Sequence, residues 1–258
     1  MKNPFISVII NCYNGERFLK EAIDSVYSQT YQNWEIIFWD NCSSDYSARI
    51  ALNYDQKLNY YKSEITASLY EARNYALEKC KGDYIAFLDS DDLWCRKKLE
   101  SQVGIINTKG VDIIYAGFDI INEKGRVIDQ GKKKFPTGRI TNYFLSGGSI
   151  SIGSVLIKKE LLSRHKFDSF YELLGDFDAW VFLSTNNSFY AINEVLEHSR
   201  SHEKNFSKIL EEKWIVERRN FYNKFITRFG FLKYPLISYF ILRSELISCI
   251  TMLRKYFK

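Results

Sequence analysis

Short runs of hydrophobic residues alternate with longer amphipathic segments in the first third of this 258-residue chain. The apolar runs Ile6–Ile10, Trp34–Trp39 and Tyr84–Leu88 have the length of buried strands. The segments Glu16–Ser28 and Leu69–Cys80, which lie between them, have helical spacing. Strands that alternate with helices in this way form parallel sheets covered by helices. The pattern therefore predicts an α/β domain with a mainly parallel central sheet flanked by helices.

The pattern becomes mixed from about residue 111 onward. Strand-like runs at Ile113–Phe118, Arg126–Ile128 and Ser154–Ile157 lie around glycine-rich turns such as 146–149. We interpret residues 111–207 as the second half of one domain, which begins with residues 1–110.

Residues 208–258 have the spacing of helices, interrupted near Gly230 and Pro235, and an unusual composition. They hold eleven Lys and Arg against four Asp and Glu, whereas residues 1–207 are slightly acidic, and they are rich in aromatic rings. Positive charge combined with aromatic rings is typical of a surface that binds either nucleic acid or an anionic membrane. We favour the membrane and expect no nucleic acid partner.

The sequence argues against a disordered protein, a membrane-spanning protein, a disulfide-rich protein and a protein with a signal peptide. Hydrophobic residues make up 46% of the chain, which suffices for a substantial core. The stretch Tyr234–Leu253 is apolar but contains Arg243 and Glu245, each costing roughly 2–3 kcal/mol at a bilayer centre, so we expect it not to cross a membrane. The five cysteines are scattered and form no C-x-x-C pair, so we expect a reducing cytoplasm and no disulfide framework. The N-terminal apolar run is too short for a signal peptide.

Three polar segments follow the three predicted strands. They are Asn11–Asn14, Asp40–Asp45 and Asp89–Asp91. In a parallel sheet, ligands bind beyond the carboxyl ends of the strands, so we expect these segments to converge on one crevice. No dinucleotide-binding or Walker glycine motif occurs, so carboxylates and a metal would have to hold any nucleotide.

The acidic cluster at 89–92 has two interpretations. Asp89, Ser90, Asp91 and Asp92 follow a buried strand, and carboxylates so close together can bind a hard divalent cation such as Mg²⁺ or Mn²⁺. The alternative is a solvated turn in which Ser90 or Asp92 caps a helix that runs from Leu93 onward.

Six motifs occur in a fixed order along the chain, and together they carry a resemblance. They are SVIINCYN at 7–14, SVYSQTYQNWEIIFWDNCSSD at 25–45, ARN at 72–74, GDYIAFLDSDDLW at 82–94, GDFDAW at 175–180 and RSHEKNFS at 200–207. This succession resembles the family 2 glycosyltransferases, inverting enzymes with a GT-A fold, over roughly residues 5–207. Nothing comparable supports residues 208–258.

The resemblance implies a nucleotide diphosphate sugar as donor, most naturally a uridine one. Tyr13, with its neighbours Asn11 and Asn14, would cradle the base and the ribose. Asp40 would accept a hydrogen bond from the base, although it could instead cap the next turn. Glu16 could reach the ribose, although an acid in the first turn of a helix is common for electrostatic reasons alone.

The resemblance also implies a metal site. Asp91 would be the main ligand of Mn²⁺ or Mg²⁺, while Asp89 would contact the ribose or share the metal and Ser90 would lie between them. Arg73 would neutralise the phosphates or steady the acidic loop, unless it is an ordinary surface arginine of a helix. His202 lies in a segment that in relatives closes over the donor and touches the metal or the phosphates; the alternative is a surface histidine.

The general base expected for inverting transfer aligns with Asp176. The family usually has Glu-Asp at this point, but here Gly175 replaces the first acid. Asp178 matches a frequent second acid. The alternative is that Asp176 caps a helix over Phe177–Ser184. Two smaller departures are Asn11, where proline is frequent, and Cys42, where glycine is common.

Together these observations predict a GT-A glycosyltransferase domain at 1–207, with a nucleotide-binding half at 1–110 and an acceptor half at 111–207, and a basic aromatic helical tail at 208–258. The expected reaction extends a glycan or a lipid-linked saccharide in cell-surface polysaccharide synthesis, from the cytoplasmic side of the membrane. Two rivals stay open: a non-catalytic protein that binds sugar nucleotides or glycans, and a glycoside hydrolase, which also uses paired carboxylates.

Overall fold

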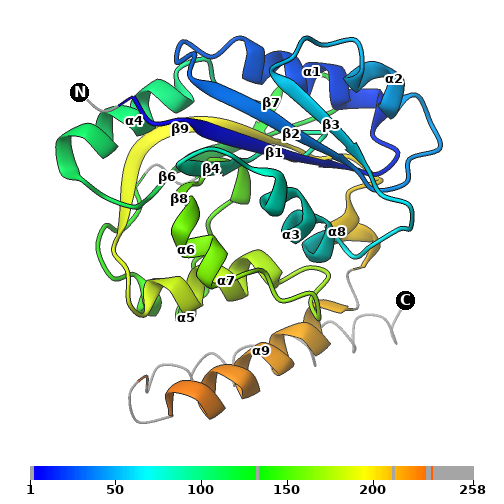
Figure 1. The fold of residues 1–258 in the computed structure, drawn as a ribbon. Coiled ribbons are helices and arrows are strands. Elements are labelled where there is room, and N and C mark those ends of the chain that lie inside the picture. Colours follow the sequence, from blue (N-terminus) through cyan, green and yellow to red (C-terminus); the bar gives the residue numbers. More distant parts are fainter. Residues whose placement is uncertain (1–2, 132–133, 211–212, 231–233, 235–258) are drawn as a thin grey trace.

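A computed structural model describes residues 3–131, 134–210, 213–230 and 234. Its centre is one curved sheet with helices on both faces (Figure 1). The strands run in the order β3-β2-β1-β4-β8-β6-β9-β5, and β7 pairs with β6. Their bounds are β1 Ile6–Cys12, β2 Trp34–Asp40, β3 Leu58–Lys62, β4 Tyr84–Phe87, β5 Leu93–Trp94, β6 Ile113–Ile121, β7 Val127–Asp129, β8 Leu156–Lys158 and β9 Phe189–Arg200.

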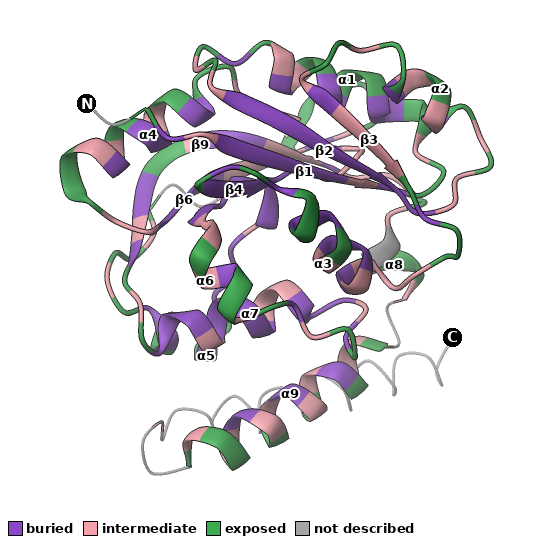
Figure 2. Ribbon diagram, viewed as in Figure 1, coloured by how far each residue is buried: buried purple, intermediate pink, exposed green. Residues whose placement is uncertain are grey.

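Helices lie in most of the connections between these strands and after β9, and most of them have one buried face (Figure 2). Their bounds are α1 Glu16–Tyr27, α2 Ser47–Ala51, α3 Leu69–Lys79, α4 Lys98–Lys109, α5 Thr141–Leu145, α6 Lys159–Arg164, α7 Gly175–Ser184, α8 Phe206–Ile209 and α9 Lys213–Phe229, with one 3-10 turn at Ile152–Ser154.

The predicted parallel half is present. β3, β2, β1 and β4 are all parallel, and every residue of β2 and β4 is buried, as continuous apolar runs require. Cys12 at the end of β1 lies opposite Asp40 at the end of β2, and Ile9 lies opposite Phe87 at the end of β4. The loops that follow β1, β2 and β4 therefore leave the sheet at the same edge.

The second half of the sheet is mixed. β8 lies antiparallel between β4 and β6, while β6 and β9 form a long parallel pair. β5 pairs with the end of β9, with Leu93 opposite His198. The helix expected from Leu93 onward is therefore wrong: the chain first forms this short strand, and the helix α4 begins only at Lys98.

Each face of the sheet covers its own hydrophobic core. The core on one face includes residues of α1 and α4, and the core on the other includes residues of α3, α5, α7 and α9. Within α9, Phe221 and Phe225 are 2% and 4% exposed and belong to this second core. The described part of the basic tail is thus helical, as predicted, and packs on the domain below α7 (Figure 1).

The tail helix α9 is followed by Gly230, whose φ of 76° is a conformation that favours glycine, in agreement with the predicted interruption. Pro235 and nearly all of the apolar stretch Tyr234–Leu253 lie outside the described residues. Within the described ranges, no helix is long and apolar enough to cross a membrane. The four cysteines in these ranges are free thiols, as expected.

Candidate active site

The loops after β1 and β2 interlock through hydrogen bonds. The backbone N–H of Asn14 donates to Ser43 Oγ at 3.0 Å, and the N–H of Ser44 donates to Asn14 Oδ1 at 2.8 Å. Glu16 Oε2 accepts the N–H of Tyr46 at 2.8 Å. The predicted convergence of these two loops is present, and the side chains of Asn14 and Glu16 hold the second loop in place.

The backbone of the loop after β2 explains why glycine is common in the family at the position of Cys42. Cys42 has a φ of 67°, in the left-handed region that glycine enters without steric cost. The loop after β4 joins the same crevice, because a Cβ added to Gly15 would lie 3.0 Å from Ser90 Oγ. All three polar segments therefore meet at the carboxyl edge of the sheet.

Asp40 is fully buried at this edge. Its Oδ1 accepts the N–H of Ser43 at 2.7 Å, and its Oδ2 accepts the hydroxyl of Tyr60 at 2.6 Å. The structural alternative for Asp40, capping the next turn, is thus present in the molecule. Tyr13 is 58% exposed beside it, whereas Asn11 is half-buried and its Nδ2 has no hydrogen-bond partner within the described residues.

Arg73 joins α3 to the acidic loop. Its side chain is 3% exposed, and its Nη2 donates to Asp89 Oδ1 at 2.7 Å. The interpretation of Arg73 as an ordinary surface arginine is wrong, and its expected role of steadying the acidic loop is present. The guanidinium carbon also lies 5.2 Å from the ring centre of Tyr70.

Asp91 and His202 are brought together from distant parts of the chain. His202 Nε2 lies 2.8 Å from Asp91 Oδ2, and Asn205 Nδ2 donates to the same oxygen at 3.1 Å. His202 Nδ1 accepts the N–H of Lys204 at 3.2 Å, which places the ring proton of the neutral imidazole on Nε2, facing the carboxylate. Burial and the charge of Asp89 raise the pKa of Asp91, and His202 opposes the rise.

This pair fits the donor set of a hard divalent cation shared with a substrate. Within the part of the chain that the structure describes, no group of three or more His, Cys, Asp or Glu side chains is gathered as a metal cage. Such a cage is not needed, because Mg²⁺ is usually bound through one or two carboxylates together with waters and substrate phosphates. Asp91 is the carboxylate that could supply a ligand, since Asp89 is already paired with Arg73. His202 could join it once its ring proton has moved from Nε2 to Nδ1, which would break the bond from the Lys204 N–H, because a metal binds only an unprotonated ring nitrogen.

Arg200 is a central residue that sequence reasoning missed. It is 2% exposed, its Nε donates to the carbonyl of Asp91 at 2.8 Å, and its Nη1 donates to the carbonyl of Glu123 at 3.0 Å. Its Nη2 is paired with Glu21 at 2.8 Å. Its position as the first residue of the RSHEKNFS motif was the available signal.

The backbone of Arg200 also corrects the expected role of Asp92. Asp92 Oδ1 accepts the N–H of Arg200 at 2.7 Å, so it ties the acidic loop to the end of β9 and does not cap a helix. Asp92 is 6% exposed, and burial, then the charge of Asp91, raise its pKa well above the ordinary range.

Asp176 lies in the first turn of α7, near enough to Arg73 and Asp89 for their charges to act on its pKa. The helix begins at Gly175 with Leu174 as N-cap, so the expected helix start at Phe177 and the N-cap role of Asp176 are both wrong. Its Oδ1 accepts the hydroxyl of Tyr70 at 3.0 Å and the N–H of Phe177 at 2.8 Å. Burial raises the pKa of Asp176, and the positive charge of Arg73 opposes that rise.

Asp178, the possible second acid, is held elsewhere. It is 5% exposed, and both its oxygens accept hydrogen bonds from Lys224 of α9 at 2.9–3.0 Å. The same ammonium group pairs with Asp168 at 2.7 Å. The structure therefore pairs Asp178 with the tail helix, whereas Asp176 contacts Tyr70.

A second residue that sequence reasoning missed is Glu217 of α9. Its carboxylate is 5% exposed and accepts the backbone N–H groups of three consecutive residues, Glu172, Leu173 and Leu174, at 2.8–3.0 Å. These residues immediately precede α7. The tail helix thus fixes the segment that leads into Asp176, and no local pattern in the sequence marks Glu217 for this role.

The fold and the site define a class of protein. A largely parallel sheet that gathers an acidic pair, a buried arginine and a separate carboxylate beyond its carboxyl edge is the arrangement of an α/β protein that binds a ligand there. A sequence model described as glycosyl transferase family 2 matches residues 7–165, and the chain belongs to this family.

Curated relatives support the same family. An uncharacterized glycosyltransferase of Rickettsia typhi, RT0329, is 35% identical over 78% of this chain, and the chain spans 65% of the length of that protein. The UDP-Glc:alpha-D-GlcNAc-diphosphoundecaprenol beta-1,3-glucosyltransferase WfgD of Escherichia coli is 32% identical over 75% of each chain. The putative teichuronic acid biosynthesis glycosyltransferase TuaG of Bacillus subtilis is 29% identical over 89% of this chain and 91% of its own.

Among solved structures, residues 1–349 of S. aureus TarS in complex with UDP-GlcNAc match with a TM-score of 0.75 at 19% identity, over 92% of this chain and 71% of that one. This likeness shows the fold. The predicted family and the GT-A fold are confirmed, and membership of this family favours the transferase interpretation over hydrolysis and over binding without catalysis.

Proposed function

We propose that this protein transfers a sugar, with inversion, from a uridine diphosphate sugar to a hydroxyl of a glycan or a lipid-linked saccharide. The observation that carries the proposal is the pair of carboxylates, Asp89 and Asp176, that bind neighbouring residues on one face of α3. Asp89 is bound to Arg73 at the donor loops, and Asp176 is bound to Tyr70 at the start of α7. WfgD, a relative at 32% identity, is named for a UDP-Glc donor and a diphosphoundecaprenol-linked acceptor, which supports this donor and acceptor class.

On the donor side, the exposed ring of Tyr13 is available to a base, whereas the amide nitrogen of Asn11 is buried and, within the described residues, has no hydrogen-bond partner. Asp40 orients this region through Tyr60 and Ser43, and a direct bond from Asp40 to a base would replace one of these contacts.

Arg73 is positioned to stabilise negative charge near the diphosphate. A divalent cation, Mn²⁺ or Mg²⁺, held by Asp91 and His202, would offset the charge on the leaving diphosphate. A glycosyltransferase of the same fold, the mannosyltransferase PcManGT from Pyrobaculum calidifontis, was solved with GDP-Man and Mn²⁺.

On the acceptor side, Asp176 acts as the general base. It takes the proton of the acceptor hydroxyl while that oxygen attacks the anomeric carbon from the face opposite the diphosphate. Its raised pKa, caused by burial, makes it a stronger base than an exposed aspartate. Asp178 is engaged by Lys224, so we assign it to holding α9 against α7.

We also propose that the tail brings the protein to the cytoplasmic face of an anionic membrane. The apolar residues Phe221 and Phe225 face the domain, so the charged residues Lys213, Arg219 and Arg228, which are exposed, would make the contact. Reversing Lys213 and Arg219 to Glu in the full chain should abolish sedimentation with phosphatidylglycerol vesicles. If the full chain does not bind such vesicles, the proposed membrane contact of the tail is contradicted.

The experiment that tests the proposed function has two parts. Calorimetry of UDP, GDP and TDP with Mn²⁺ or Mg²⁺ should show metal-dependent binding of UDP. Asp176→Asn should then keep that binding and lower the transfer rate by about 10²–10⁴-fold. Sugar release from an oligosaccharide without any nucleotide would instead favour a hydrolase. Nucleotide binding without turnover on a broad acceptor panel would favour a binding protein.

A further inference from the structure

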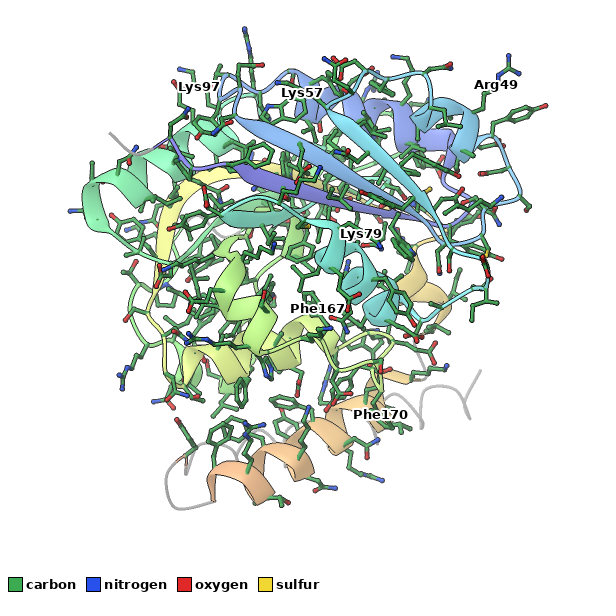
Figure 3. All side chains as sticks on the ribbon, in the orientation of Figure 1. Arg49, Lys57, Lys79, Lys97, Phe167 and Phe170 are labelled. Carbon is green, nitrogen blue, oxygen red and sulfur yellow. The ribbon has the colours of Figure 1, made fainter. Side chains whose placement is uncertain are left out.

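Gly175, where the family usually has an acid, lies against the ring of Tyr70. A Cβ added to Gly175 would lie 2.6 Å from Cγ and Cδ2 of Tyr70 and 2.7 Å from Cδ1, closer than real side chains approach. The ring cannot easily move away, because Tyr70 is 2% exposed and packs against Phe167, which is labelled in Figure 3. The centres of the two rings lie 5.7 Å apart. The side chain of Tyr70 thus occupies the space beside Gly175.

The hydroxyl of Tyr70 reaches the candidate base from this position. It lies 3.0 Å from Asp176 Oδ1 and 3.0 Å from the carbonyl of Leu173. A hydroxyl has one proton to donate and can also accept. While Asp176 is ionised, the hydroxyl can donate its proton to the carboxylate. Once Asp176 is protonated, the hydroxyl can accept from the acid and donate to the carbonyl of Leu173. Both protonation states of the base are hydrogen-bonded without any movement of the ring.

Tyr70 also connects Asp176 to the donor loops. Tyr70 and Arg73 are three residues apart and lie on one face of α3. The guanidinium of Arg73 lies 5.2 Å from the ring centre and binds Asp89 at 2.7 Å. Burial, then the nearby charge of Asp176, raise the pKa of the Tyr70 hydroxyl well above its ordinary value, so it stays a donor at neutral pH.

We propose that Tyr70 is the positioning residue of the general base: its hydroxyl binds Asp176, and its ring fills the space beside Gly175, where the family usually has an acid. The proposal rests on the proposed function, since it assigns a partner to Asp176 as base. Tyr70 itself contacts neither sugar; it acts through Asp176, whose charged and titratable neighbours are Tyr70, Arg73 and Asp89.

Tyr70→Phe tests this, because it keeps the ring and removes only the hydroxyl. We expect kcat to fall roughly ten- to a hundredfold, the effect of one hydrogen bond to a charged group, while KM for the donor is unchanged. The acidic limb of the pH–rate profile should move to higher pH, because the ionised carboxylate loses a donor. The control is Tyr75→Phe, on the same helix, whose hydroxyl binds Glu71 and whose loss should leave the profile unchanged.

A second set of variants tests the pairing with Gly175. Gly175→Ala should lower kcat in the wild-type background, because its Cβ meets the ring. In the Tyr70→Ala background, where that space is empty, Gly175→Ala should not lower kcat further. Equal losses in both backgrounds would overturn the pairing.

Failure of this inference is distinguishable from failure of the proposed function. Transfer that requires Asp176 but is the same in Tyr70→Phe overturns the role of Tyr70 and leaves the transferase assignment standing. Wild-type transfer by Asp176→Asn overturns the base assignment and the role of Tyr70 with it. NMR titration of the Asp176 carboxyl carbon gives a readout without turnover: an unchanged pKa in Tyr70→Phe contradicts the proposal, and a raised one supports it.

Discussion

His202 Nε2 lies 2.8 Å from Asp91 Oδ2, although 111 residues separate the two in the chain. The contact closes the segment after β9 over the acidic loop after β4. Asn205, from this segment, binds the side chain of Asp91, and Arg200, the last residue of β9, binds its backbone carbonyl. The acidic loop is therefore held from two sides, by Arg73 of α3 and by the end of β9 with the residues that follow it.

Asp91→Asn and His202→Ala should each weaken UDP binding in the presence of Mn²⁺ by at least about tenfold, because each removes one proposed ligand. UDP binding without metal should change little. Calorimetry with and without Mn²⁺ measures both. Asp129→Asn, on the exposed strand β7, is the matched control, and an equal loss in it would contradict the assignment.

Arg200→Lys should destabilise the fold by about 1–3 kcal/mol and weaken metal-dependent UDP binding. Lysine keeps the charge but cannot reach the carbonyl of Asp91, the carbonyl of Glu123 and Glu21 together, as the guanidinium does. Urea unfolding and calorimetry measure the two effects. The exposed Arg164→Lys should change stability by no more than about 0.5 kcal/mol.

Glu217→Ala should lower the free energy of unfolding by about 3 kcal/mol or more, because three backbone donors before α7 lose their acceptor. The rate of transfer should fall with it, since Asp176 follows this segment directly. Thermal unfolding and an activity assay measure both. Asn223→Ala, on the exposed side of α9, is the control. The three hydrogen bonds to the Glu217 carboxylate form a clamp on the segment before α7, and an unchanged melting temperature in Glu217→Ala would show that this clamp does not stabilise the fold.

The protein should lose stability as the pH falls from about 6.5 to about 4, in part because of His165. Burial, then the charges of Lys224 and Arg228, lower the pKa of His165 to about 4, while Asp168 opposes them. The unfolded chain binds the proton below pH 6.5 and the folded protein only near pH 4, so protonation favours unfolding over this window.

His165→Phe keeps the stack on Phe182, whose ring centre lies 3.8 Å away, and removes the titration. Its stability should fall less steeply than that of the wild type between pH 6.5 and 4. Parallel curves in denaturant titrations across this range would rule out the contribution of His165.

The sequence predicted those parts of the molecule that depend on local pattern. The strands β1, β2 and β4 follow from continuous apolar runs, and the meeting of their loops follows from parallel pairing. Arg73 and Asp89 lie only 16 residues apart, in two neighbouring motifs, and the predicted role of Arg73 in steadying the acidic loop matches their contact.

The errors and omissions come from tertiary contacts. Leu93 pairs with His198 in the sheet, which overrides the helical pattern expected after the acidic cluster. Tyr70 meets Asp176 across 106 residues, and Glu217 meets Leu174 across 43. Neither tyrosine in a helix nor glutamate in a helix is unusual, so nothing local distinguishes these two from their neighbours.

The clamp made by Glu217 also bears on the order in which the protein can be assembled during synthesis. The strands β1 to β4 and the helix α3 are made first, and domains generally fold from the N-terminal side as the chain emerges. The backbone donors of Glu172, Leu173 and Leu174 receive their acceptor only after α9 has emerged from the ribosome. The donor loops can therefore form on a nascent chain whose base is not yet fixed, and transfer requires that α9 has been made.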